Sequence, residues 1–298
     1  NILGPDSLSL DSVDYPSMGS KDLIVAIKYC GICGTDLSYI SSGGLMGPQK
    51  DPMPLGHEMS GTVIEIGTDV KDININDRVA INPMGNNNSI GNGGPEGGMT
   101  NFLLVKNAVL NESIFKLPDE MSFEIGALIE PFAVALRTIN RSNLDQDAKI
   151  AVCGLGCIGF SVVTLLSYFG YKNIIAIDLY NLRVSNANEL DALKAYSDWE
   201  SFSNALKEFH GKGEIFGIPV SNTDIFIDCT GNHKLISDII NISKKHARIV
   251  VTGLHQEQAL IDFRAVLMRE LEITCSMAYS NNEFLESLNI LSKDMIDE

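Results

Sequence analysis

The sequence predicts an α/β protein in which a strand-rich first part is followed by a doubly wound parallel sheet. Two observations support this prediction. The first third of the chain consists of loops and short strand-like runs, whereas from Lys149 onward continuous apolar runs alternate with helical patterns. Such an alternation is typical of a parallel sheet that helices cover on both faces. With 298 residues, the chain is long enough for two domains.

Three apolar runs predict the strands of the first part, at residues 23–29, 61–66 and 78–81. Residues 82–98 are rich in Gly and Asn, which predicts a surface loop. An amphipathic pattern then runs from Ser122 to about Ile139 and predicts a helix. Because Pro131 lies inside this pattern, we expect a kink or two helices that meet there.

In the second part, apolar runs predict further strands at residues 150–153, 173–178, 224–229, 248–251 and 271–275. Helical patterns follow the first two of these runs, at residues 157–168 and 181–191. The chain shows no internal repeat. A strand–helix series of this kind predicts a parallel sheet.

Charge and composition argue against several classes of function. The 38 Asp and Glu residues outnumber the 22 Lys and Arg residues, so a nucleic acid is not expected as the main partner. The chain has no apolar run of 18 residues, which predicts no membrane span, and its first residues do not resemble a signal peptide. The six cysteines are not spaced like a disulfide framework, so we expect a reducing, cytoplasmic location.

A glycine-rich motif predicts a dinucleotide site. Gly154, Gly156 and Gly159 form G-x-G-x-x-G, with Cys157 and Ile158 before the last glycine. The motif follows an apolar strand and opens a helical pattern, which is the context that gives it meaning. Its glycines allow a tight turn, the approach of a pyrophosphate to the backbone, and close packing of helix and strand. The alternative is a turn-forming glycine cluster in an unrelated α/β protein.

The residue expected to contact the adenosine ribose is Asp178, which lies 19 residues after Gly159 at the end of a predicted strand. A carboxylate there would repel a 2′-phosphate, so the sequence favours NAD over NADP. Arg183 could cover the same edge of the adenosine, or it could accommodate NADP.

Three local features in the first part predict a metal site. Cys30 and Cys33 follow a predicted strand, Gly56-His57-Glu58 comes about two dozen residues later, and Glu130 precedes Pro131. Cys, His and Glu suit zinc, and a catalytic zinc needs three protein ligands and an open position. Each feature also has an ordinary explanation: a redox pair of cysteines, a surface turn, or a charge at a helix start.

Taken together, these motifs resemble the medium-chain dehydrogenase/reductase family of zinc-dependent alcohol dehydrogenases, and within it the sorbitol, butanediol and threonine dehydrogenase branch. The resemblance runs along nearly the whole chain. It implies a GroES-like catalytic domain at residues 1–131 and a Rossmann domain at residues 132–280. Residues 281–298 would begin a segment that returns to the catalytic domain and continues beyond this chain. The motifs that carry the resemblance are Gly31–Asp36, Gly56–Glu58, Asp77–Val79, Glu130–Ala135 and Gly154–Gly159.

The resemblance also implies roles for residues at the metal. Cys33 and His57 would be zinc ligands, either Glu58 or Glu130 would be the third protein ligand, and Cys30 would be a neighbour only. Residues 82–100 contain no cysteine, whereas many relatives hold a second, structural zinc there, so we expect one catalytic zinc per chain.

Further roles follow from the same resemblance. Thr35 would relay the proton of the alcohol, and Asp36 would orient His57. Thr230 and Gly231 would line the nicotinamide side of the cofactor. Several relatives carry His where Arg137 stands, so their proton-exit route or cofactor contact at that position is not carried over to this chain.

We therefore expect hydride transfer from a secondary alcohol, a polyol or vicinal diol, to NAD, with a ketone as the product. The alternatives are a zinc-free NAD(P)H-dependent quinone or enone reductase of the same fold, and a non-catalytic NAD-binding protein. Relatives extend the last sheet edge across a dimer axis. Residues 261–275 therefore predict a homodimer or homotetramer.

Overall fold

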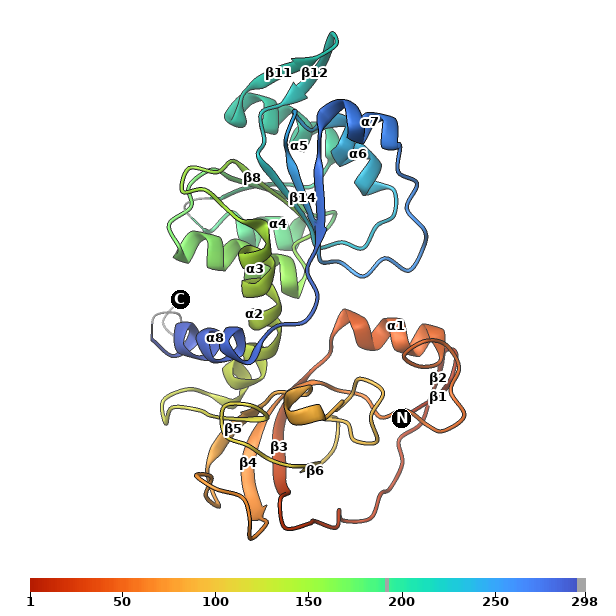
Figure 1. The fold of residues 1–298 in the computed structure, drawn as a ribbon, viewed down its shortest axis with the longest axis vertical. Coiled ribbons are helices and arrows are strands. Elements are labelled where there is room, and N and C mark those ends of the chain that lie inside the picture. The colour runs from red at the N-terminus through yellow and green to blue at the C-terminus, as the bar shows by residue number, and fades with distance from the viewer. Residues whose placement is uncertain (191–192, 294–298) are drawn as a thin grey trace. The chain divides into compact units, whose positions relative to one another are not determined.

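The computed structural model describes residues 1–190 and 193–293, and the chain divides into two compact units. The first unit comprises Asn1–Ala133 together with the described residues from Tyr279 onward, and the second comprises Val134–Ala278. Figure 1 shows the elements of both units. The helix α2 (Phe123–Ser142) contributes residues to each.

A five-stranded antiparallel sheet forms the centre of the first unit, in the order β6-β3-β4-β5-β7. The side chains of Leu23, Val25 and Val63 are fully buried in one apolar cluster. Leu23 and Val25 share a face because successive side chains of a strand point to opposite faces. All three predicted strands are confirmed. The strands of the sheet are β3 (Leu23–Gly31), β4 (Glu58–Ile66), β5 (Arg78–Ile81), β6 (Phe102–Val105) and β7 (Ile114–Lys116), and a separate hairpin consists of β1 (Ile2–Gly4) and β2 (Ser7–Leu8).

Two expectations for the first part need correction. Residues 82–98 form a loop with one short 3-10 helix, η1 (Gly85–Asn87), but the loop is partly internal, since Asn82 and Ile90 are only 2% and 1% exposed. Of the two alternatives expected at Pro131, a kink or two helices, the second is wrong, because α2 is one continuous helix with Pro131 inside it. Its buried apolar side chains, such as Ile129 and Leu136, stabilise the helix on both sides of the proline.

The C-terminal helix α8 (Asn281–Lys293) belongs to the first unit. There Phe284 packs against Phe115, with the ring centroids 4.5 Å apart. Residues 294–298 of the segment that we expected to return to the catalytic domain lie outside the described residues. In the described part of the chain, no helix combines the length and the apolar character that crossing a bilayer requires.

A six-stranded parallel sheet forms the second unit, in the order β10-β9-β8-β13-β14-β15. The order reverses at β8 (Ile150–Cys153), with β9 (Ile174–Ile177) on one side and β13 (Ile225–Asp228) on the other. All predicted strands are confirmed. The sequence did not predict the edge strand β10 or the hairpin β11–β12. The remaining strands are β10 (Leu193–Tyr196), β11 (Lys212–Ile215), β12 (Ile218–Ser221), β14 (Arg248–Val251) and β15 (Glu272–Cys275).

Helices cover both faces of this sheet (Figure 1). The side chains of Ala151, Phe226 and Ile249 share one face and pack with those of Phe202 and Ile239 from two helices. The predicted helix at 157–168 is confirmed, whereas the one predicted at 181–191 ends at residue 187, and residue 191 lies outside the described residues. The helices are α3 (Cys157–Tyr168), α4 (Asn181–Ala187), α5 (Trp199–Ala205), η2 (Leu206–His210), α6 (Leu235–Ile242) and α7 (Phe263–Arg269).

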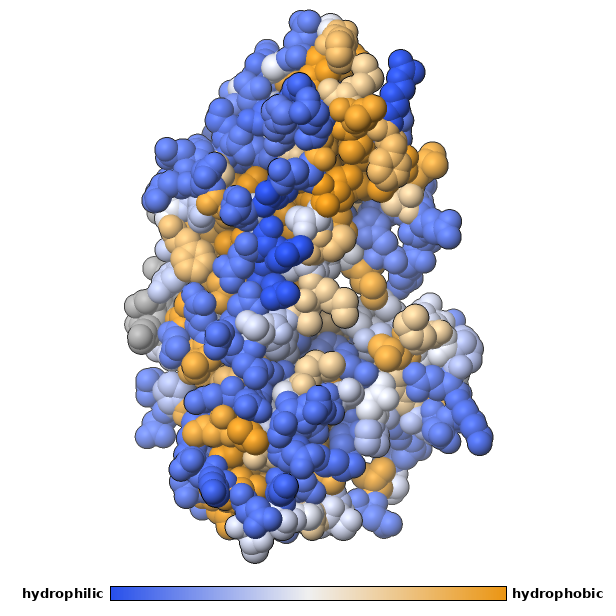
Figure 2. Space-filling model, viewed as in Figure 1, coloured by the Kyte–Doolittle hydropathy of each residue, from blue (hydrophilic) through white to orange (hydrophobic). Residues whose placement is uncertain are grey.

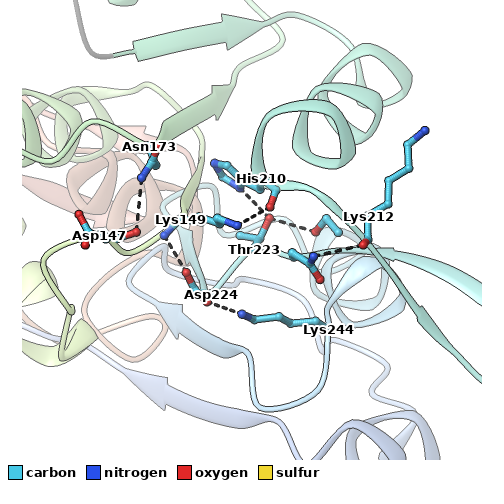
Figure 3. A network of polar contacts seen from close by, with 10 residues as sticks. Asp147, Lys149, Asn173, His210, Lys212, Thr223, Asp224 and Lys244 are labelled. Carbon is cyan, nitrogen blue, oxygen red and sulfur yellow. Dashed lines mark hydrogen bonds and ion pairs between the residues drawn. The ribbon is translucent and has the colours of Figure 1, made fainter.

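A polar network ties together the amino ends of the central strands, as Figure 3 shows. The backbone N–H of Lys149 donates to Asp224 at 2.8 Å, and the ammonium of Lys149 donates to the carbonyl of His210 at 2.6 Å. The Nδ1 atom of His210 lies 2.9 Å from the Thr223 hydroxyl. Burial lowers the pKa of His210 to about 4. This edge therefore has a neutral, buried histidine in a structural role, and the glycine-rich motif lies at the opposite, carboxyl edge of the sheet.

Candidate metal centre and dinucleotide-binding turn

The start of helix α1 (Gly34–Ser42) positions the first candidate ligand, Cys33. Its Sγ atom accepts a hydrogen bond from the backbone N–H of Thr35 at 3.4 Å. In return, the carboxylate of Asp36 accepts a hydrogen bond from the backbone N–H of Cys33 at 2.9 Å. These two bonds form a capping box, so the motif at residues 31–36 fixes both side chains locally.

His57 and Glu58 lie at the start of β4, next to Cys33. One donor atom from each of these three side chains lies within 4.8 Å of the others. The Oδ1 atom of Asp36 is 3.4 Å from Nδ1 of His57, which leaves Nε2 as the nitrogen for a metal. A Cβ atom at Gly31 would stand 2.1 Å from Oε2 of Glu58, so glycine at this position makes room for the carboxylate.

Two side chains of this cluster are buried and affect each other's pKa. His57 and Glu58 are only 4% and 5% exposed. Burial raises the pKa of Glu58, and the charge of His57 offsets this only in part. Burial also lowers the pKa of His57, but its hydrogen bonds to Asp36 and Cys33 raise it overall to about 11. Sulfur, nitrogen and oxygen donors that converge in a buried place suit a zinc ion.

Glu130, in the middle of α2, lies outside the cluster of three. Burial raises the pKa of Glu130 to about 7, although the charge of His57 opposes the shift. The hydroxyl of Tyr279 forms a hydrogen bond with Glu130, and burial followed by the charge of Glu130 raises the pKa of Tyr279 well above its usual value. Of the two glutamates that the sequence put forward, the structure therefore places Glu58 in the cluster and Glu130 beside Tyr279.

Sequence reasoning missed Tyr279 and Asn82, which support Glu130. The hydroxyl of Tyr279 lies 3.4 Å from the side-chain oxygen of Asn82, and Asn82 donates to the side chain of Asn281 at 2.9 Å. These residues come from the loop after β5 and from the C-terminal segment. Neither belongs to a motif, so no local signal could have identified them.

Cys30 is outside the cluster, although it forms a C-x-x-C pair with Cys33. Burial raises the pKa of Cys30 to about 12, and such a thiol is a poor nucleophile. Cβ atoms at Gly56 and Gly98 would stand 2.7 and 3.1 Å from its sulfur, so two glycines enclose it. Thr35 is half-buried in the first turn of α1, directly beyond Cys33.

The glycine-rich turn of the second unit is shaped by its backbone. Gly154 has a φ of +90°, a conformation that other residues rarely adopt. A Cβ atom at Gly159 would stand 1.8 Å from the carbonyl oxygen of Gly154, whereas one at Gly156 would meet nothing closer than Arg183 at 3.9 Å. Gly156 is the residue before α3, and Cys157 and Ile158 open that helix. The turn therefore leaves the positive end of α3 accessible to an anion.

Asp178 follows β9, where the sequence placed it, and it is 7% exposed. Its carboxylate accepts hydrogen bonds from the backbone N–H groups of Leu155 at 2.7 Å and Tyr180 at 2.9 Å. The guanidinium of Arg183 lies 3.3 Å from the same carboxylate and stacks on the ring of Tyr180. Asp178 thus holds the glycine-rich turn against the end of β9, with Arg183 beside it at the surface.

Thr230 and Gly231 follow β13 at the same edge of the sheet as the glycine-rich turn. A Cβ atom at Gly154 would stand 2.8 Å from the methyl group of Thr230, so the two loops are in contact. Both the hydroxyl and the backbone N–H of Thr230 donate to Asp228. All the residues that the sequence assigned to the cofactor therefore lie at the carboxyl edge of one sheet.

Two family models match the chain. Residues 19–119 match the alcohol dehydrogenase GroES-like domain, and residues 157–293 match the zinc-binding dehydrogenase domain. The first match includes Cys33, His57 and Glu58. The second begins at Cys157, within the glycine-rich turn.

Named relatives are similar along nearly the whole chain. Human sorbitol dehydrogenase is 30% identical, with 94% of this chain and 81% of that protein covered. The (R,R)-butanediol dehydrogenase of Bacillus subtilis is 29% identical, with 98% of this chain and 91% of that protein covered. A crystal structure of 2R,3R-butanediol dehydrogenase from Bacillus subtilis superposes with a TM-score of 0.82 at 26% identity, covering 98% of this chain and 87% of that one.

Proposed function

The chain belongs to the zinc-binding dehydrogenases with a GroES-like domain, and on this basis we propose that it oxidises a polyol or vicinal diol to a ketone while it reduces NAD. The observation that carries the proposal is the convergence of Cys33, His57 and Glu58 to within 4.8 Å. The substrate class is that of the named relatives, which include a sorbitol dehydrogenase and a butanediol dehydrogenase.

Cys33, His57 and Glu58 fit a zinc ion, which when bound supplies a Lewis acid that makes the substrate hydroxyl more acidic. Asp36 orients His57 through Nδ1, at 3.4 Å. Glu130, held by Tyr279, is the carboxylate available to replace Glu58. We propose one zinc per chain, because residues 82–100 contain no cysteine for a second site.

The protein's own groups then move the proton and position the cofactor. The hydroxyl of Thr35 takes the proton of the substrate hydroxyl and passes it outward. When bound, NAD would supply the hydride acceptor that takes up the two electrons of the alcohol C–H bond, which balances the oxidation of the alcohol to a ketone. The glycine-rich turn from Gly154 to Gly159 would hold the pyrophosphate through backbone N–H groups at the start of α3.

The carboxylate of Asp178 favours NAD over NADP. A carboxylate can accept about four hydrogen bonds. Asp178 already accepts from Leu155, Tyr180 and Arg183, which leaves one position for a ribose hydroxyl. A 2′-phosphate at this place would meet the negative charge of Asp178. Arg183 is already paired with that charge, which limits how far it can attract the phosphate.

The sheet edge at β15 supports pairing with a second copy of the chain. Phe263 and Leu267 of α7 are 71% and 75% exposed, and Ile273 of β15 is 38% exposed. Figure 2 shows apolar side chains gathered over α7. An apolar surface beside an unpaired strand edge is a ready site for sheet extension. We propose a homodimer or a homotetramer, to be tested by analytical ultracentrifugation of the protein and of an Ile273→Lys variant.

Zinc content and NADH formation in the same sample test the proposed function. We expect about one zinc per chain and NADH formation that depends on an added diol or polyol. Cys33→Ser should lose both zinc and activity, whereas the matched variant Cys30→Ser should keep zinc, because Cys30 lies outside the cluster. Quinone or enone reduction without zinc would instead assign the chain to a zinc-free reductase. NADH binding without turnover of any alcohol would indicate a non-catalytic protein.

A further inference from the structure

A histidine and a buried carboxylate meet at the carboxyl edge of the sheet, and no role above includes them. The Nε2 atom of His255 lies 3.0 Å from Oδ2 of Asp228. Asp228 is the last residue of β13 and is fully buried, whereas His255, in the segment after β14, remains 18% exposed. Because a carboxylate accepts hydrogen bonds, Nε2 carries the proton and donates it to Asp228. The other ring nitrogen, Nδ1, is then the one left for a further partner.

Asp228 is held in place by more than the histidine. Its other oxygen, Oδ1, accepts from the hydroxyl of Thr230 at 2.6 Å and from the backbone N–H of Thr230 at 2.9 Å. Its backbone carbonyl accepts from the N–H groups of Thr252 and Gly253, each at 2.9 Å. Asp228 therefore connects the segment after β13 to the segment after β14, and it fixes the orientation of the His255 ring.

The two segments pack too closely for side chains between them. A Cβ atom at Gly231 would stand 2.3 Å from the carbonyl oxygen of Leu254, and one at Gly253 would stand 2.2 Å from the backbone N of Gly231. Thr230 in turn contacts the glycine-rich turn at Gly154. His255 is thus connected to the dinucleotide-binding turn through a short series of packed residues.

The strand order indicates which half of a dinucleotide lies near His255. Asp178 follows β9, on one side of β8, and marks the adenosine half. The strands β13 and β14 lie on the other side of β8. A dinucleotide that crosses the edge at the reversal of strand order therefore has its nicotinamide half over β13 and β14.

From this placement we infer that His255, oriented by Asp228, binds the nicotinamide-ribose half of the dinucleotide. The inference rests on the proposed function, because it needs a dinucleotide in the turn. Through Nδ1, the ring forms a hydrogen bond with a ribose hydroxyl or with the carboxamide. Asp228 acts as a positioning residue, since it does not touch the cofactor itself.

Binding of NADH and of AMP to the purified protein separates the two halves of the site. Titration calorimetry gives both affinities, and energy transfer from Trp199, the one tryptophan of the chain, provides a second signal for NADH. We expect His255→Ala to weaken NADH binding about tenfold or more, as loss of an oriented hydrogen bond does, while AMP binding stays within about twofold. An equal loss for AMP and NADH, or NADH binding within twofold of the original, would overturn the inference.

A matched control is His233→Ala. His233 pairs with Glu257 at 3.5 Å and also joins the segments after β13 and β14, but its acid partner is 74% exposed rather than buried. We expect this variant to leave both affinities within about twofold. If His233→Ala loses as much NADH affinity as His255→Ala, the loss is a general effect of substitutions in these two segments, and the inference is overturned.

The positioning role of Asp228 is tested by a double-mutant cycle. Asp228→Asn should weaken NADH binding, because a neutral amide holds the His255 ring less firmly than a charged carboxylate does. Once His255 is replaced by Ala, the same change should have no further effect on NADH affinity. Additive effects would assign Asp228 a purely structural role. If the unaltered protein binds AMP but no NADH, the proposed function itself fails. This result concerns the unaltered protein and is therefore distinct from the results with the variants.

Discussion

The metal cluster of the first unit and the glycine-rich turn of the second unit are built by different means. The turn lies within residues 154–159, and the groups that it offers to a ligand are backbone N–H groups at the start of a helix. The cluster combines Cys33 with His57 and Glu58, and its binding groups are side chains, two of them buried. A backbone site depends on the absence of side-chain atoms, whereas a site of buried side chains depends on their charges and on the groups that orient them.

Among variants that keep zinc, the largest effect on activity is expected at Thr35, beside the candidate metal cluster. Thr35→Val removes the hydroxyl with little change in shape, so turnover of the best diol should fall about 10²–10⁴-fold. Thr35→Ser, which keeps a hydroxyl, should retain most turnover. Zinc content and NADH affinity should be unchanged in both. Turnover of the Val variant equal to that of the original protein would remove Thr35 from the proton route.

Acid should destabilise the second unit through His210. Its folded pKa of about 4 lies below the ordinary value of 6.5, so the unfolded chain binds the extra proton. This contribution, on the order of 3 kcal/mol, is fully present above about pH 6.5 and is lost as the pH falls toward 4. Fluorescence of Trp199, which lies in this unit, reports its denaturant unfolding at pH 7 and pH 5.

The matched variant is His210→Gln, which can still bond to Thr223 but does not titrate. It should lose less stability between pH 7 and pH 5 than the original protein. An equal loss in both proteins would show that other groups cause the acid sensitivity.

The glycine-rich turn offers a contrast between two substitutions of the same kind. Gly159→Ala places a Cβ atom 1.8 Å from a backbone oxygen, so it should destabilise the second unit by about 1–3 kcal/mol. Gly156→Ala meets no atom closer than 3.9 Å and should leave the unfolding midpoint unchanged, but it should weaken NADH binding. Unfolding curves and NADH titrations of both variants check this. Unchanged NADH affinity for Gly156→Ala would move the pyrophosphate away from this backbone.

The smallest of these effects is expected for Asp36→Asn. The amide keeps an acceptor oxygen for the cap of α1 but weakens the contact with His57, so zinc affinity should fall about 10–100-fold. Competition with a chelator measures the affinity. Asp69→Asn, on the surface of the same unit and bonded to Ser20, is the control and should leave the zinc affinity unchanged. An unaltered affinity in Asp36→Asn would mean that His57 needs no orienting carboxylate.

Local patterns predicted the three inner strands of the first sheet and five of the six strands of the second, and the failures have identifiable causes. The strands at 78–81, 150–153 and 248–251 have the predicted bounds, because an apolar run between turn residues is a local signal. The short strand β10 was missed, since its pairing with β9 is what makes it a strand. Of the kink or the two helices expected at Pro131, two helices do not form, because packing of apolar side chains outweighs one lost hydrogen bond.

By itself, the sequence determined the alternation of strands and helices, the glycine-rich turn with its acid, and the residue types for a zinc ion. These features are encoded within short stretches, where spacing and side-chain chemistry suffice. Only the tertiary structure decided that Glu58 rather than Glu130 joins Cys33 and His57, that Tyr279 holds Glu130, and that Asp228 meets His255. Each of these contacts brings together side chains from separate elements, and such distances depend on how strands pair and helices pack.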